Sequence, residues 1–222
     1  MEKVSFKTQD NVTIVGNYWP RGTNEVLLLH MMPATKESWN DFAEKLADKN
    51  FSVLAIDLRG HGESIEQNGM KLNYKVFSDA QHQSSIKDVE AAAQFLKEKG
   101  GETLSLAGAS IGANLALEYQ AQHPEVKKTI LLSAGTMYRG LETIPYARQL
   151  QDDQEVYFVA GSFDGRSAGS AETMAKDIAG EITSETQMKI YATTAHGTDI
   201  FSEYPQFMDE LVLWVQSESL LI

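Results

Sequence analysis

Short, uninterrupted apolar runs alternate with segments of helical periodicity along most of the chain, and this alternation limits the fold more than any other feature. Runs such as 25–29 and 155–160 have the length and composition of strands that are covered on both faces. Between such runs, apolar residues recur at helical spacing, as in 85–99 and 111–122. Strands that alternate with helices predict a mostly parallel sheet with helices on both faces.

The expected elements can be given as residue ranges. The pattern predicts buried strands at 25–29, 51–57, 103–107, 126–132, 155–160 and 188–192. It predicts helices at 85–99, at 111–122, around 145–150, near 171–179, and in a last long helix that contains Phe207, Leu211 and Val215. A polar loop is expected from Gly60 to Phe77.

Two further segments have a more specific pattern. Residues 4–8 and 12–18 alternate apolar with polar and are joined by a turn at 9–11, which predicts an antiparallel hairpin at one edge of the sheet. A helix is expected after Ser38, where Ser38 and Asp41 can form a capping box. Its buried face would carry Trp39, Phe42 and Leu46.

The size of the chain fits one domain, and we expect residues 1–222 to form it without a separate lid domain. Apolar residues make up 42% and charged residues 23% of the chain, as in ordinary globular proteins. The first residues lack the apolar segment of a secretory signal, and no apolar run approaches the ~18 residues that span a bilayer. A cytoplasmic location without a membrane partner is therefore expected.

Cysteine is absent, which excludes disulfides, thiolate metal sites and a cysteine nucleophile. No histidine cluster has the spacing of metal ligands, so neither a metal nor another cofactor is expected. The net charge of −12 disfavours binding to nucleic acid, which depends on clustered lysine and arginine.

The pattern Gly-x-Ser-x-Gly occurs at 108–112, between a predicted strand and a predicted helix. A sharp strand-to-helix turn forces the central residue, Ser110, into a strained conformation, and side chains at the two glycine positions would collide. The turn also aims the helix N-terminus at the serine hydroxyl, where its N–H groups can stabilise a developing oxyanion. This context favours Ser110 as a nucleophile over a turn without catalytic meaning.

A serine hydroxyl needs a base within hydrogen-bond reach, and the base needs an acid that orients it. Asp164 follows one buried strand and His196 follows the last strand, so both are expected at the same sheet edge as Ser110. The chain order is Ser, Asp, His. Glu142 and Asp199 are the alternative acids, although neither follows a strand as directly.

With these residues in place, the whole chain resembles the α/β-hydrolase family. Residues 57–64, Asp-Leu-Arg-Gly-His-Gly-Glu-Ser, are similar to the stretch that the family carries after its fourth strand. Residues 27–30, Leu-Leu-Leu-His, resemble the family's His-Gly-x segment after the third strand, whose x residue gives one oxyanion N–H. By that resemblance Met32 would be this donor, and Ile111, which follows the nucleophile, would be the second. Met31 stands where the family usually has glycine, and the pair Met31–Met32 is also consistent with filling of the core.

The resemblance implies a serine carboxylesterase that acts on a small-molecule ester through an acyl-enzyme. A thioesterase or an acyltransferase with the same triad is the alternative among enzymes, and a ligand receptor of the same fold is the alternative outside them. Met31, Met137 and Tyr138 are candidates for the substrate pocket. Because the segment 134–154 is too short for a lid domain, we expect short acyl chains.

The other histidines are expected to be structural. His30 would stabilise its loop by hydrogen bonds, and His61 lies in a turn flanked by glycines. His82 and His123 are expected to be solvated.

Overall fold

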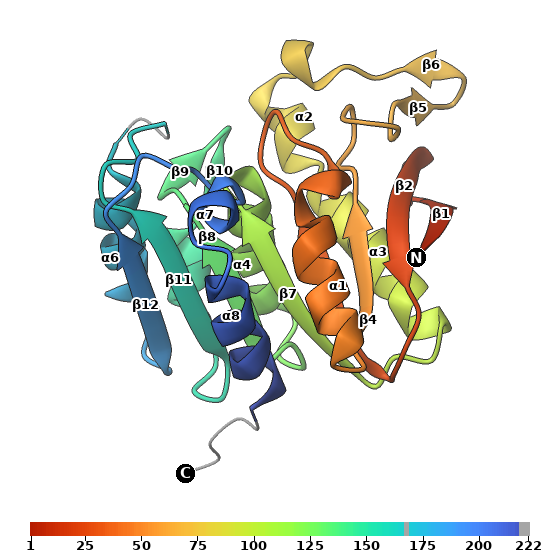
Figure 1. Cartoon of the computed structure of the whole chain (residues 1–222). Helices are drawn as coiled ribbons and strands as arrows, with labels where there is room; N and C mark the ends of the chain where they lie inside the picture. Colours follow the sequence, from red (N-terminus) through yellow and green to blue (C-terminus); the bar gives the residue numbers. More distant parts are fainter. Residues whose placement is uncertain (167–168, 218–222) are drawn as a thin grey trace.

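A computed structural model of the chain describes residues 1–166 and 169–217, and these residues form a twisted sheet with helices on both faces (Figure 1). The main strands are β1 (Glu2–Lys7), β2 (Val12–Trp19), β3 (Asn24–Leu29), β4 (Ser52–Ile56), β7 (Thr103–Ala109), β8 (Lys128–Leu132), β11 (Glu155–Gly161) and β12 (Thr186–Tyr191). The longer helices are α1 (Asn40–Asp48), α3 (Ile86–Glu98), α4 (Ile111–Gln122), α6 (Ala171–Ala179) and α8 (Phe207–Gln216).

The strand order is β12-β11-β8-β7-β3-β4-β2, and all neighbours from β12 to β4 are parallel. β2 runs antiparallel to β4, and β1 pairs antiparallel with β2 through the predicted turn. The mostly parallel sheet and the antiparallel hairpin at its edge are thus confirmed. This order brings the carboxyl ends of β3, β7, β8, β11 and β12 to one edge of the sheet.

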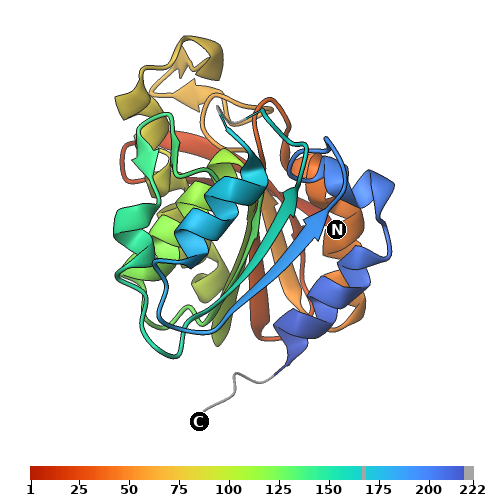
Figure 2. The ribbon, with the colours of Figure 1, turned by 90° about the vertical axis from the view of Figure 1, so that its left-hand side faces the viewer.

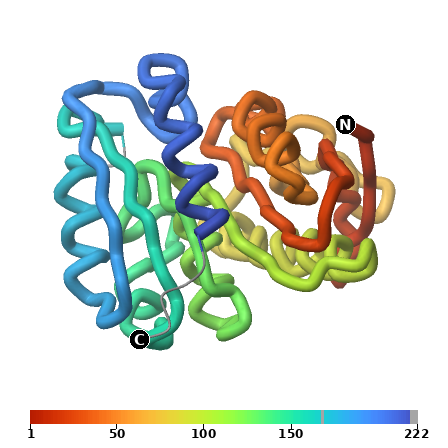
Figure 3. Tube along the Cα trace, turned by 60° about the horizontal axis from the view of Figure 1, so that its bottom comes forward, coloured from red at the N-terminus to blue at the C-terminus, as the bar shows by residue number. Residues whose placement is uncertain are grey.

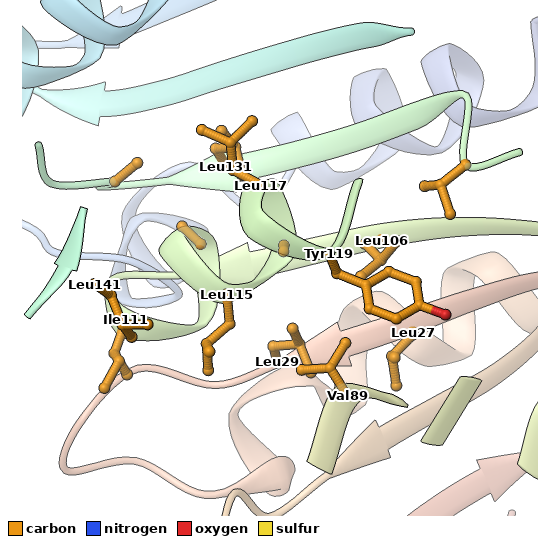
Figure 4. Close-up of a cluster of buried hydrophobic side chains, with 14 of the residues drawn as sticks. Leu27, Leu29, Val89, Leu106, Ile111, Leu115, Leu117, Tyr119, Leu131 and Leu141 are labelled. Atoms are coloured by element: carbon orange, nitrogen blue, oxygen red, sulfur yellow. The ribbon is translucent and has the colours of Figure 1, made fainter. Parts of the chain in front are cut away.

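Two apolar layers hold the helices to the sheet. On one face, α3, α4, α5 (Ile144–Ala147) and α6 contribute to a buried cluster, part of which Figure 4 shows around Leu115, Leu117 and Leu131. On the other face, α1, α7 (Asp199–Glu203) and α8 form the second cluster, with Trp39, Phe42 and Leu46 buried as predicted. Figure 2 shows the strands between these layers, and Figure 3 shows α1 and α8 side by side. No helix in the described residues is both long and apolar enough to cross a membrane.

Smaller elements lie beyond the carboxyl ends of the strands (Figure 1). The segment 60–77, predicted as a loop, contains β5 (Glu66–Gln67), β6 (Met70–Lys71) and the 3-10 turn Tyr74–Val76, and α2 (Asp79–Gln83) follows it. β9 (Met137–Tyr138) and β10 (Leu141–Glu142) form a small hairpin between β8 and α5. Asn114 in α4 anchors this hairpin, because its side-chain amide donates to the Leu141 carbonyl and accepts from the Gly135 N–H.

Two local predictions are wrong. Ser38 does not cap α1: it lies inside the 3-10 turn Lys36–Trp39, and its buried hydroxyl has no partner among the described residues. The start of this turn is held instead by Asp57, which accepts from the Lys36 N–H at 2.9 Å and from the Lys36 ammonium at 2.8 Å. His82 is not solvated but 3% exposed, because the capping box between Ser78 and Gln81 starts α2 where His82 packs on Phe77.

Candidate active site

Ser110 occupies the turn between β7 and α4 with φ 53° and ψ −117°, a conformation that residues other than glycine rarely adopt. A Cβ on Gly108 would overlap the carbonyl of Gly112, and a Cβ on Gly112 would overlap the carbonyl of Leu29. The strained serine and the steric need for both glycines, as predicted from the sequence, are therefore present. The Ser110 N–H donates to the Leu132 carbonyl at 2.8 Å, which ties the turn to β8.

Asp164 and His196 meet at the same sheet edge. His196 Nδ1 lies 2.7 Å from Asp164 Oδ2, and both side chains are buried. Of the three candidate acids, Asp164 is thus the one that contacts the imidazole. Glu142 is exposed in β10, and Asp199 pairs with Arg166 at 3.1 Å.

The Asp164 carboxylate is held as an anion. Burial raises the pKa of this carboxyl, but the hydrogen bonds from His196, the Arg166 N–H and the Ser133 hydroxyl outweigh that effect and place its pKa below the usual range. An anionic acid can orient the imidazole and stabilise it when it takes up a proton.

Ser133 is a part of the site that the sequence analysis missed. Its hydroxyl donates to Asp164 Oδ2 at 2.9 Å and accepts from the Gly197 N–H at 2.9 Å, so it connects the acid to the loop that carries His196. Ser133 is fully buried and has φ 50°. Its position directly after β8 is the only sequence signal that could have indicated this role.

Gly197 brings the His196 loop against the serine turn. A Cβ on Gly197 would lie 3.1 Å from the Cβ of Ala109 and 2.6 Å from the sulfur of Met31, and the residue has φ 56°. Gly197 beside His196 and Ala109 beside Ser110 are therefore packed too closely to leave room for a side chain at position 197. The Met31 side chain is buried, and it belongs to the apolar cluster that also contains Ala109 and Ala195.

The loop after β3 is fixed by His30. Its Nδ1–H donates to the Met31 carbonyl at 2.8 Å, and its Nε2 accepts from the Leu58 N–H at 3.0 Å, so the predicted loop-stabilising role is confirmed. Burial lowers the pKa of His30 to about 4, which keeps the ring neutral. Met31 does not have a positive φ, so the loop forms without the glycine usual at this position. Within the described residues, the N–H groups of Met32 and Ile111 have no backbone acceptor.

The segment 57–64 contacts the loop after β3, because the Leu58 N–H donates to His30. Asp57 binds Lys36, and Arg59 pairs with Asp88 at 2.8 Å in the interior. The Ser64 hydroxyl accepts from the Val15 N–H at 2.8 Å. The motif therefore joins the end of β4 to β2, to the turn that contains Lys36 and to α3.

The predicted pocket residues lie in different environments. Met137 is 62% exposed on the β9–β10 hairpin, and Tyr138 beside it is half-buried against the core. Met31 is buried beneath the His196 loop, where it fills the core. In the part of the chain that the structure describes, no group of three His, Asp or Glu side chains could hold a metal ion.

Comparison with solved structures defines the class of fold. An esterase of Pyrococcus furiosus, Pf2001, superimposes with a TM-score of 0.76 over 97% of this chain and 91% of its own, at 16% identity. The esterase EaEST of Exiguobacterium antarcticum superimposes with a TM-score of 0.75 over 97% of this chain and 100% of its own, at 14% identity. The sheet order and the serine turn place the chain among the α/β-hydrolases.

Within that class, the chain belongs to the hydrolase family described as "Serine aminopeptidase, S33", whose sequence model matches residues 21–152. The AB hydrolase superfamily protein YisY of Bacillus subtilis is 29% identical over 150 residues, which cover 66% of this chain and 51% of YisY. Uncharacterized proteins of Mycobacterium match over 31% of their length, at 28% identity. The match thus spans about a third to a half of the length of these curated relatives.

Proposed function

We propose that the chain is a serine hydrolase that cleaves carboxylic esters with short acyl chains. The observation that carries this proposal is the 2.7 Å contact between His196 and Asp164 on a loop that packs directly against the strained Ser110 turn. A nucleophile, a base and an orienting acid on three strand ends are the parts that acyl transfer needs. The family membership and the esterases of similar fold support the same reaction class.

In the proposed mechanism, the Ser110 hydroxyl attacks the ester carbonyl while His196 takes its proton through Nε2. Asp164 holds the Nδ1–H tautomer and stabilises the imidazolium. The N–H groups of Met32 and Ile111 donate to the tetrahedral oxyanion. His196 then protonates the leaving alcohol, activates water, and the acid is released from Ser110.

A fluorophosphonate probe tests this proposal directly, because it reacts only with an activated serine. We expect labelling of the wild type and none of Ser110→Ala, together with hydrolysis of an aryl acetate by the wild type alone. An unlabelled wild type would contradict the proposal and favour a ligand receptor of the same fold. Faster turnover of aryl thioesters than of the matched oxygen esters would identify a thioesterase instead.

A further inference from the structure

A cavity lies at the amino ends of the strands, at the opposite edge of the sheet from Ser110. Its volume is about 420 Å³, within the range of roughly 300–1,000 Å³ of pockets that hold small molecules. Glu25 at the start of β3 and Thr103 at the start of β7 form one side. Tyr119 and His123 at the end of α4 form another. Figure 4 shows Tyr119 and Ile111 at opposite ends of the buried apolar side chains around α4.

Glu25 is the unusual residue of this cavity. It is only 4% exposed, and its carboxylate has no hydrogen-bond or ion-pair partner within residues 1–166 and 169–217. A Cβ on Gly101, which also lines the cavity, would fall on the Glu25 carboxylate. The carboxylate therefore occupies the cavity wall, at a place that only glycine leaves open.

The other carboxylates of the cavity have partners. Glu90 accepts from the Gln9 amide, Glu102 from the Thr23 hydroxyl, and Glu125 lies 3.2 Å from His123. Burial raises the pKa of Glu25 to about 7, because its anion has lost part of its water without gaining a donor. A positive group placed in the cavity would supply the missing donor.

An aromatic surface lies beside these carboxylates. The rings of Tyr119 and His123 are stacked with centroids 3.9 Å apart, and Tyr119 is 6% exposed. Ala93 and Leu104 add apolar wall. An aromatic face next to a carboxylate favours an ammonium group that is attached to an apolar body, since the ring attracts the cation and the body covers apolar surface. The net charge of −12 also attracts a cationic ligand at long range.

We propose that this cavity binds a small organic amine, with Glu25 as the counter-ion of its ammonium group and the Tyr119–His123 stack as its aromatic wall. This site is separate from Ser110 and does not depend on the proposed esterase function. Metal binding is a weaker interpretation, because the described residues contain no cluster of three ligands.

Titration calorimetry with benzylamine and benzyl alcohol tests the proposal on the unaltered protein, because the two probes share their shape and differ in charge. At about pH 8 the Glu25 carboxyl is ionised. Benzylamine should then bind about tenfold or more tightly than benzyl alcohol, since hydrogen bonds between charged groups exceed neutral ones by that order. Absence of benzylamine binding, or equal affinity for both probes, would overturn the proposal.

The variant Glu25→Gln tests the residue itself, because it keeps the shape and removes the charge. It should lose about tenfold or more in affinity for benzylamine and change little for benzyl alcohol. Glu44→Gln is the matched control: it changes the net charge equally but lies exposed on α1. Cooperative thermal unfolding of both variants shows that they are folded. Unchanged benzylamine affinity in folded Glu25→Gln would contradict the assignment.

Discussion

Ser110 can hold its strained backbone because several neighbours fix it at once. Its N–H is bound by Leu132, and its carbonyl accepts from Ala113 and Asn114 in the first turn of α4. Strain of this kind costs on the order of 1–3 kcal/mol and persists only where the surroundings determine the conformation. The same turn places the hydroxyl at the N-terminus of α4, where the helix dipole favours a developing negative charge.

Replacement of Ser110 by alanine should abolish turnover without loss of the fold, because it removes only the hydroxyl oxygen. Losses of triad serines reduce kcat by on the order of 10⁶-fold. Ester hydrolysis and thermal unfolding of Ser110→Ala measure the two parts of this expectation. A variant that keeps more than about a hundredth of the wild-type rate would mean that another residue is the nucleophile.

Ser133→Ala should impair both stability and catalysis. The change leaves the buried Gly197 N–H without its acceptor, which costs about 1–3 kcal/mol, and removes one donor from Asp164. Denaturant unfolding and kcat at saturating substrate measure the two effects. Ser162→Ala is the control, because Ser162 lies near the same strand ends and its hydroxyl has no partner among the described residues. Equal kcat for the two variants would show that Ser133 is only structural.

Among single residues, the sequence allowed prediction of those site residues that belong to a motif or directly follow a strand. Ser110, Asp164 and His196 each follow a recognisable apolar strand, so their common edge could be inferred. The bridging position of Ser133 could not, because it depends on how β8 lies beside β11 and how far the His196 loop returns. A single serine carries no pattern that shows such a contact.

Among the elements, the strands and longer helices follow from hydrophobic periodicity, whereas the small elements above the sheet do not. β5 and β6 are two residues each and are stabilised by pairing with β2 and with each other. α2 depends on the capping box at Ser78 and on packing against Phe77. Such elements are decided by tertiary contacts, so the polar composition of 60–77 predicted only a loop.

His61 links the segment 60–77 to the loop after β3. Its ring stacks on Tyr74 with centroids 3.8 Å apart and meets the edge of His30. Nδ1–H donates to the Arg59 carbonyl, while Nε2 is buried without a partner among the described residues. Burial, with a smaller contribution from His30, lowers the pKa of His61 to about 3.

This lowered pKa predicts a pH dependence of stability. Below about pH 6.5 the unfolded chain protonates this histidine and the folded protein does not, so the contribution of neutral His61 is lost as the pH falls. His61→Phe keeps the ring and cannot titrate. The unfolding free energy of the wild type should therefore fall relative to that of His61→Phe by about 1.4 kcal/mol per pH unit below pH 6.5. Urea unfolding at about pH 7 and about pH 5.5 measures this difference. If the unfolding free energy changes by the same amount in both proteins between these pH values, the prediction is contradicted.

On the scale of the whole molecule, α4, β3 and β7 each connect the two ends of the sheet. Their residues at one end form the serine turn and the loop of Met31 and Met32, and their residues at the other end line the Glu25 cavity. The sequence predicted the first end because ligands of such sheets bind at the carboxyl edge. It did not predict the second, which needs Glu25, Gly101 and Tyr119 from three separate segments to converge.

The length of acyl chain that the proposed enzyme would accept also depends on the whole molecule. Between β8 and β11 the chain forms only the β9–β10 hairpin and the one-turn helix α5, so no large cover is built in this segment. Ser110 is 2% exposed, and for the proposed ester hydrolysis we expect an acyl chain to enter a confined space beside the hairpin. Each methylene that becomes buried there contributes about 0.8 kcal/mol, and a methylene that extends past the hairpin contributes little.

We therefore expect kcat/KM to be highest for acyl chains of roughly two to six carbons and to fall for longer ones. Met137, which is 62% exposed on the hairpin, is the candidate pocket residue whose truncation tests this limit. The measurement is kcat/KM for aryl esters from acetate to palmitate, with Met137→Ala as a second series. An optimum at about ten carbons or longer would contradict the confined site, and it would mean that the segment 60–77 moves to cover a longer chain.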